Sequence, residues 1–364
     1  MLHVGRWARY RTLVRNAALS CAGIALSHSI ALAQSTDNFY AGKRITLVIG
    51  YQPGSGYDQY ARTFAMHVGK YIPGNPVFVP QNMLGAGTRV AANHLYNVAA
   101  KDGTALGIVD QNIPLDQALG YPGVQFDVRK FNWIGNMVVI NNVLVVWHTS
   151  GIKTIADATQ KQILMGSNAG TSPALIYPQV SNSLLGTKFK IIAGYADSTQ
   201  MNLAMERGEV QGRGSNSWQS YKVLTPDWVS EKKIIVLFQV GSRRERDLPD
   251  VPLLTELAKN DEDRAVFETL SAPISFARAI IAPPEVPTER VALLRRAFDS
   301  TMKDPAFLED TKKQGIDINP LSGEEVQKIV DRTLNTPSAT IAHLKQAILP
   351  RDATDKDGKP AASE

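Results

Sequence analysis

Residues 44–68 decide the fold of this chain, and they read RITLVIGYQPGSGYDQYARTFAMHV. The first six residues are a β-branched, apolar run that stops at Gly50 and Pro53, which is typical of a buried strand. From Tyr57 the apolar residues recur at helical spacing until Gly69, so this part predicts a helix. A buried strand that leads through a glycine-rich turn into a helix indicates an α/β protein with a parallel sheet.

The same unit recurs along the chain. Residues 77–79 lead through Gly85-Ala86-Gly87 into helical spacing near 88–98, and residues 103–109 are typical of the next strand. A second series of such units follows. It comprises expected strands at 143–147, 163–165, 188–192 and 234–238 and expected helices at 172–185 and 198–207, with further helices at 286–302 and 323–333. This alternation predicts two α/β units.

The first 33 residues have the order of a secretory signal peptide. Four arginines at positions 6–15 precede an apolar run over residues 17–32, which ends in Ala31-Leu32-Ala33. We expect cleavage after Ala33 and export to the periplasm. The remaining chain carries 35 basic and 34 acidic residues, and this near-neutral balance gives no support to nucleic-acid binding.

Chain length predicts the number of lobes. The mature chain would have 331 residues and no cysteine, whereas single cores stop growing near ~250–300 residues. We therefore expect two lobes. Residues 34–140 and 241–350 form a discontinuous lobe 1, residues 141–240 form lobe 2, and the polar residues 351–364 are predicted to be a disordered tail.

Three strand-to-helix turns are rich in glycine and small polar residues. They read QPGSGYD at 52–58, GAGT at 85–88 and GSNAGTS at 166–172. The first turn of a helix leaves backbone N–H groups unpaired, the helix dipole adds positive charge there, and glycine lets a ligand approach closely. The three turns together predict a small-anion site at the carboxyl ends of the strands. Each turn alone is equally compatible with a plain connection.

Charged residues near these turns also have structural interpretations. Asp58 precedes Arg62 by four residues and stands at a helix start, so it favours an ion pair and a structural role over ligand contact. In that role it would fix the turn that carries the amides. Arg89 is better explained as a surface residue than as an anion clamp.

Enzyme motifs fail at named positions. Residues 53–56 lack the first glycine of a Gly-x-Ser-x-Gly nucleophile elbow, and Gln59 stands where a dinucleotide fingerprint needs glycine. The histidines are scattered and no His-Glu-x-x-His motif occurs. We therefore expect no catalytic residue, no metal and no cofactor.

An ordered series of motifs nevertheless resembles the Bug-type solute-binding proteins of tripartite tricarboxylate transporters. The series spans nearly the whole mature chain. It comprises Phe39-Tyr40-x-Gly42-Lys43, Pro53-Gly54-Ser55-Gly56-Tyr57-Asp58, Pro80-Gln81-Asn82-Met83-x-Gly85-Ala86-Gly87, Lys101-Asp102-Gly103-Thr104, Gly194-Tyr195, Leu203-Ala204-Met205-Glu206-Arg207-Gly208-Glu209-Val210 and Leu248-Pro249-Asp250-Val251-Pro252.

The resemblance implies a class II periplasmic binding protein, with two α/β lobes that are joined by crossing hinge strands and close like a flytrap. It implies a small carboxylate ligand, held by loop amides and delivered to the membrane permease subunits of a tripartite transporter, and we expect a monomer. Residues 215–218 would lie near the hinge. The implied ligand-binding residues are Pro53, Gly54, Ser55, Gly56, Tyr57, Asp58, Asn82, Gly170, Thr171, Ser172, Tyr195, Asp197 and Ser198.

Two departures leave the ligand open. Ser55 replaces a glycine that is common in the family, and Asp197 stands where many members have a small residue, so an amine-bearing or aromatic acid stays possible. The alternative functions are a secreted serine hydrolase with Ser55 as nucleophile, a ligand sensor for a signalling partner, and a structural or adhesive exported domain.

Overall fold

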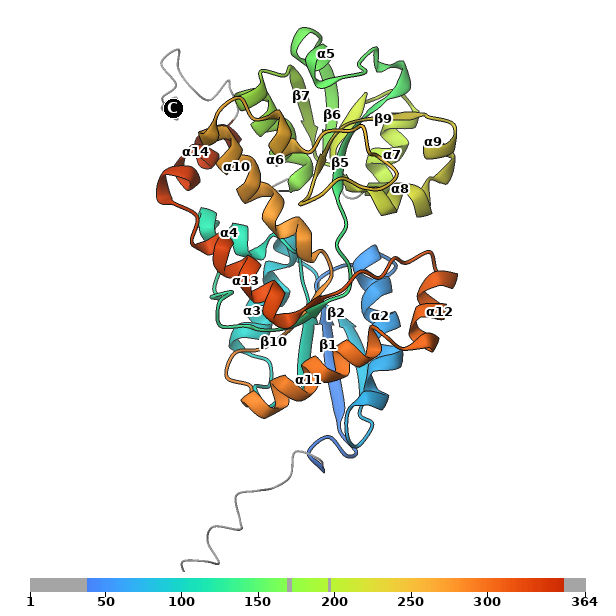
Figure 1. Cartoon of the computed structure of the whole chain (residues 1–364), viewed down its shortest axis with the longest axis vertical. Coiled ribbons are helices and arrows are strands. Elements are labelled where there is room, and N and C mark those ends of the chain that lie inside the picture. The colour runs from blue at the N-terminus through green and yellow to red at the C-terminus, as the bar shows by residue number, and fades with distance from the viewer. Residues whose placement is uncertain (1–37, 169–171, 196–197, 350–364) are drawn as a thin grey trace, which may run out of the picture.

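The computed structural model describes residues 38–168, 172–195 and 198–349. Figure 1 shows two lobes, one above the other, each built on its own sheet with helices packed around it. The α/β class expected from the sequence is confirmed. The signal peptide, its cleavage site and the predicted tail lie outside the described residues.

The first sheet carries the N-terminal strand–turn–helix unit. Its six strands lie in the order β11-β4-β10-β3-β1-β2, with β2 and β3 parallel to β1 and β10 antiparallel to both of its neighbours. Ile45 and Leu47 of β1 face one apolar core and Val48 faces another, because both faces of the sheet are covered. The strands are β1 (Arg44–Ile49), β2 (Val77–Asn82), β3 (Ala105–Ile108), β4 (Asn132–Asn136), β10 (Ala279–Ala282) and β11 (Leu321–Ser322).

Helices of this lobe come from both halves of the chain. α2 packs on β1 and β2, and α11 and α12 pack in turn on α2. On the other side α13 packs on β4 and α4. The helices are α2 (Gly56–Val68), α3 (Arg89–Asn97), α4 (Ile113–Leu119), α11 (Thr288–Thr301), α12 (Pro305–Lys313) and α13 (Gly323–Leu334).

The second sheet repeats the pattern of the first. Its order is β7-β6-β8-β5-β9, with β7 and β8 parallel to β6 and β5 antiparallel to its neighbours. The strands are β5 (Asn142–Trp147), β6 (Ile163–Ser167), β7 (Phe189–Ala193), β8 (Gly212–Ser217) and β9 (Ile234–Val240). The helices are α5 (Ile155–Gln160), α6 (Pro173–Val180), α7 (Ser198–Glu206), α8 (Trp218–Leu224) and α9 (Pro226–Ser230).

Several elements differ from the sequence-based expectations. The strands β4, β8 and β10 had no predicted counterpart, and the helix expected over 172–185 divides into α6 and a π-helical turn at Ser181–Leu185. β8 reads GRGSNS, which lacks the β-branched residues that signal a strand. It forms because β5 and β6 flank it in the centre of the sheet.

Two late helices pack against the second sheet's lobe. α10 (Asp261–Ser271) and α14 (Ser338–Ile348) contact each other, and α14 contacts α6. Val266, Phe267 and Leu344 share one apolar core with residues of β5 and β6, and Figure 1 shows both helices beside α6. The expected lobe bounds, which assign residues 241–350 to lobe 1, stay a proposal. Within that range, α10 and α14 pack on the lobe of the second sheet, which is the upper lobe in Figure 1.

The two sheets are connected by crossing segments. One runs from β4 to β5, and another returns from α10 to β10. Asn136 is fully buried between them: its Nδ2 donates to Val138 O at 2.8 Å, and its Oδ1 accepts from the Arg278 amide at 2.8 Å. The Met137 amide donates to Arg278 O at 3.2 Å. Both segments are thereby tied to each other.

Candidate functional site

The turn between β1 and α2 is shaped by its own residues. Ser55 has extended backbone angles, and its Oγ accepts from the Asp58 amide at 3.3 Å, so it is the N-cap at which the helix begins. Gly54 has a φ of +79°, a left-handed conformation that glycine adopts without strain. The sequence GSG therefore sets both the bend and the first residue of the helix.

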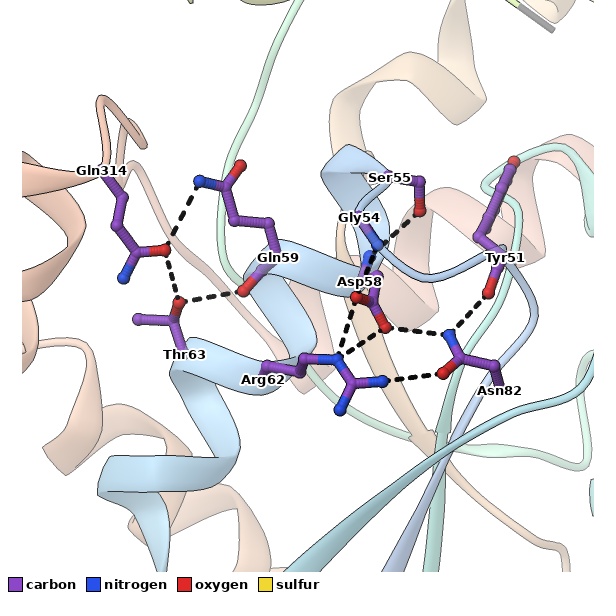
Figure 2. Close-up of polar contacts among 9 residues, drawn as sticks. All are labelled: Tyr51, Gly54, Ser55, Asp58, Gln59, Arg62, Thr63, Asn82 and Gln314. Carbon is purple, nitrogen blue, oxygen red and sulfur yellow. Dashed lines mark hydrogen bonds and ion pairs between the residues drawn. The ribbon is translucent and has the colours of Figure 1, made fainter.

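Asp58 holds this turn together from inside the helix (Figure 2). Its side chain is 5% exposed, and its Oδ2 accepts from the Gly54 amide at 2.9 Å. Arg62 Nε donates to both carboxylate oxygens at 2.9 Å, and Asn82 Nδ2 donates to Oδ1 at 2.8 Å. Both carboxylate oxygens thus have partners within the protein, and the predicted pair with Arg62 is confirmed.

Asn82 completes the same network. It ends β2, donates to Tyr51 O at 2.8 Å and accepts from Arg62 Nη2 at 2.7 Å. Burial by itself would raise the pKa of the Asp58 carboxyl, but the hydrogen bonds from Arg62, Asn82 and Gly54 outweigh it and lower the pKa below its usual value. Asp58 is therefore ionised at neutral pH. The resemblance placed Asp58 and Asn82 among the ligand-binding residues, and in the structure their side chains support the turn.

The backbone amides of the turn are only partly free. Pro53 has no N–H, the Gly54 amide is bound to Asp58, and the Ser55 amide donates to Gln52 O at 3.2 Å. Within the described residues, the amides of Gly56 and Tyr57 have no hydrogen-bond acceptor. The predicted anion cradle over residues 53–57 is thus narrowed to two adjacent N–H groups at the positive end of a 13-residue helix.

Aromatic rings and one cation lie beside these two amides. Tyr51 and Tyr57 are stacked with ring centroids 4.0 Å apart. The Arg278 guanidinium carbon lies 3.9 Å from the centroid of the Tyr57 ring. Tyr57 donates to Gln111 Oε1 at 3.2 Å, and Tyr51 donates to Asp110. Burial raises the pKa of Tyr51 and of Tyr57, so both stay protonated.

Sequence reasoning missed Arg278. The residue lies in the segment ISFARAIIA at 274–282, where it is the only charge in a largely apolar run. A lone cation in such a run is a usable signal, since Arg is almost never fully buried unless it is paired. Its distance from the first turn, 222 positions along the chain, hid its place in the fold.

The second predicted turn, residues 85–88, packs against the first sheet. All four residues have positive φ, from 47° at Ala86 to 136° at Gly85, and Thr88 Oγ1 accepts from the Asp110 amide at 2.9 Å. Arg89 pairs with Asp116 at 3.1 Å and its side chain is only 17% exposed. Arg89 is therefore not the solvated surface residue that was expected, and its charge is used within the lobe.

The predicted residues of the second lobe are only partly described. Gly170, Thr171 and Asp197 lie outside the described residues. Ser172 caps α6 through its backbone, and its Oγ is buried without a partner among the described residues. Ser198 is held by the buried Arg213, whose Nη2 donates to Ser198 Oγ at 3.0 Å.

Residues of the two lobes also face each other. Asp110 of the first lobe helps to raise the pKa of Tyr177 on α6, after the larger effect of burial. A direct contact also crosses between the lobes, because the Tyr60 hydroxyl of α2 donates to Gln219 Oε1 of α8 at 3.0 Å. Tyr195 lies beside Gly166 and packs on the second lobe's own core.

The hydrolase alternative gains no geometric support. Ser55 Oγ serves as the helix cap. His67 pairs with Asp310 at 2.8 Å and lies 3.5 Å from Asp304. Among the described residues no group of three His, Cys, Asp or Glu side chains could hold a metal ion. In the same part of the chain, none of the helices has the length and apolar character needed to cross a membrane.

Solved structures resemble this fold over most of its length. A TctC solute-binding protein from Polaromonas, without ligand, has a TM-score of 0.63 at 19% identity and covers 85% of this chain and 99% of its own. A Rhodopseudomonas palustris protein with adipate has a TM-score of 0.61 at 18% identity, covering 84% and 97%. MatC from the same organism, with bound malate, has a TM-score of 0.59 at 16% identity, and the match covers 84% of this chain and 99% of MatC.

These likenesses confirm the predicted fold of periplasmic binding proteins. No curated protein matches the chain. The sequence profile of the tripartite tricarboxylate transporter receptor family, TctC, matches residues 61–345. A match over so large a part of the chain shows that the protein belongs to the TctC family of solute-binding receptors.

Proposed function

We propose that this protein is a periplasmic receptor that binds a small carboxylate between its two lobes and delivers it to the membrane subunits of a tripartite transporter. One observation supports the binding site most directly. The unpaired Gly56 and Tyr57 amides stand at the start of α2, where the helix dipole favours an anion. The Asp58 network keeps them in place without using them.

Membership of a receptor family supports a binding role over an enzymatic one. Two proteins of the same fold were determined with adipate and malate, which are both small dicarboxylates. We propose the same class of ligand for this chain. Ser172, Tyr195 and Ser198 of the second lobe stay candidate contacts, as do Gly170, Thr171 and Asp197.

Two amides alone give a weak site. Hydrogen bonds to charged groups contribute about 1.5–3 kcal/mol each, and association costs about 4–15 kcal/mol. Micromolar binding needs about 8 kcal/mol net. The remainder must come from further donors and from closure of the second lobe over the ligand, which excludes water.

Calorimetric titration of the mature protein, beginning at Gln34, tests the proposal. The ligands are malate, succinate, adipate and citrate, each compared with its uncharged amide. We expect at least one acid to bind in the micromolar range and its amide to bind far more weakly. If none of the acids binds or raises the melting temperature, the carboxylate assignment is wrong.

Export and delivery need separate tests. N-terminal sequencing of the protein from a periplasmic fraction should begin at Gln34, and light scattering should give the mass of a monomer. Cross-linking of the loaded protein to the membrane subunits should exceed that of the empty protein. Equal cross-linking in both states would contradict ligand-dependent delivery.

A further inference from the structure

Arg278 is a buried cation at the junction of the two lobes. The residue is 8% exposed and stands between the crossing segment and β10. Its backbone is fixed on both sides, because its amide donates to Asn136 Oδ1 and its carbonyl accepts from the Met137 amide. The position of the side chain's base is therefore set by these two segments.

The hydrogen-bonding capacity of this side chain is largely unused. A guanidinium carries five N–H donors. Nη1 donates to Ala277 O at 2.7 Å, whereas Nε is buried and has no partner. No described carboxylate forms an ion pair with it. Burying a cation without an anion is costly, so such a group calls for a further explanation.

The unused edge of the guanidinium lies at the start of α2. A β-carbon built on Gly56 would lie 3.3 Å from Arg278 Nη2, and no other heavy atom would come within 4 Å of it, apart from those of its chain neighbours and of the helix's own backbone. Nη2 thus borders the same small space as the free amides of Gly56 and Tyr57. Three donors from two distant parts of the chain converge there.

Packing on tyrosines explains the position of Arg278 only in part. Its guanidinium carbon lies 3.9 Å from the Tyr57 ring centroid and 5.3 Å from that of Tyr60. Such rings offset some of the positive charge. They do not supply the oxygen lone pairs that the free N–H groups need, whereas a carboxylate supplies both the charge and the lone pairs.

We propose that Arg278 binds one carboxylate group of the ligand and thereby selects for acids. One carboxylate oxygen accepts from Nη2 and the other from the Gly56 and Tyr57 amides. The assignment rests on the proposed function and adds a charged contact to a site otherwise built from neutral amides. The ligand class is a small acid with a free terminal carboxylate.

Arg278→Met tests this assignment, because methionine keeps an unbranched side chain against the tyrosines and loses the charge. We expect affinity for the best-binding acid to fall about tenfold to a hundredfold, as for loss of a charged hydrogen bond. Arg278→Lys should recover part of the loss. Arg207→Met is the matched control, because Arg207 is 62% exposed and this substitution removes the same net charge as Arg278→Met.

A crystal structure of the wild-type protein with that acid provides a test that needs no variant. We expect a carboxylate oxygen within hydrogen-bond distance of Arg278 Nη2. Unchanged affinity of Arg278→Met, or a carboxylate bound away from Arg278, overturns the assignment and leaves the proposed function standing. If the wild-type protein binds none of the acids, the proposed function fails and the assignment fails with it.

Discussion

The Asp58 carboxylate accepts a hydrogen bond from the Gly54 amide, 2.9 Å away and four residues earlier in the chain. This contact and the bond from the Ser55 amide to Gln52 O close the turn on itself, whereas the amides of Gly56 and Tyr57 have no acceptor among the described residues. Asp58 therefore occupies the Gly54 amide and fixes the turn from which the Gly56 and Tyr57 amides project.

Asp58→Ala is expected to lower the free energy of unfolding by about 3 kcal/mol, because it leaves the Gly54 amide, Asn82 and Arg62 without their shared acceptor. Urea unfolding measures this change. Arg62→Leu is the control: Arg62 is 44% exposed, so the loss should stay below about 1 kcal/mol. Equal losses in the two variants would contradict a central role for Asp58.

Gly54→Ala and Gly56→Ala form a matched pair of substitutions with opposite expectations. Gly54 has a φ of +79° and open space around it, so alanine there should cost about 1 kcal/mol of stability through backbone strain. Gly56 is not in the left-handed region, and its new β-carbon would stand 3.3 Å from Arg278 Nη2.

Gly56→Ala should therefore leave the unfolding free energy within about 0.5 kcal/mol of wild type and weaken acid binding at least tenfold. Thermal unfolding and calorimetric titration of both variants give the two readouts. Wild-type affinity in Gly56→Ala would show that the space beside its amide is not where the ligand binds.

Asp116 makes stability depend on pH. Burial and the nearby Asp110 raise the pKa of its carboxyl to about 6, and the Arg89 guanidinium opposes them. The unfolded value is about 3.9, so between about pH 4 and pH 6 the folded state binds more protons than the unfolded state. Stability from this group is therefore lost as the pH rises through that window, by about 2–3 kcal/mol at most.

The Asp116→Asn variant lacks this titration, so its stability relative to wild type should increase from pH 4 to pH 7. Urea unfolding at several pH values gives the difference. Arg89→Gln should lose more stability than wild type as the pH rises, and over a range that extends to higher pH, because it removes the charge that favours ionised Asp116. A constant difference between Asp116→Asn and wild type would refute the raised pKa.

Gln219 joins the two lobes. On α8 of the upper lobe, its Oε1 accepts from the Tyr60 hydroxyl at 3.0 Å and its Nε2 donates to Gly315 O at 3.0 Å. Each bond contributes about 0.5–1.5 kcal/mol. Gln219→Leu should favour a more open arrangement and increase the radius of gyration measured by small-angle scattering.

Gln314→Leu is the control for that measurement. Gln314 precedes Gly315, but its side chain accepts from Gln59 and Thr63 within the lower lobe, as Figure 2 shows. Its substitution therefore removes polar contacts that do not cross between the lobes. Scattering from this variant should match wild type. If both variants expand equally, the change reflects general loosening of the chain.

Local patterns carried the sequence predictions that succeeded. The strand at Arg44–Ile49, the helix from Gly56 and the Asp58–Arg62 pair all depend on residues within a few positions of one another. Spacing rules for strands and helices describe such neighbours well.

Contacts between residues far apart in the sequence could not be predicted from local patterns. β10 pairs Ile280 with Ile108, and Asn82 meets Asp58 from the neighbouring strand. Arg278 reaches Gly56 only because β10 enters the first sheet as an antiparallel strand. The sequence indicated that the turn exposes amides, but which amides are occupied depends on these long-range contacts.

Asn136 connects the position of Arg278 to the angle between the lobes. Its side-chain Nδ2 donates to Val138 O on one crossing segment, and its side-chain Oδ1 accepts from the backbone amide of Arg278 on the other. Any change in the angle between the lobes that bends these segments therefore moves the base of the arginine. If Arg278 holds the ligand, affinity and lobe angle are linked variables, and linkage is reciprocal. A substitution at Asn136 would then alter ligand affinity without contacting the ligand.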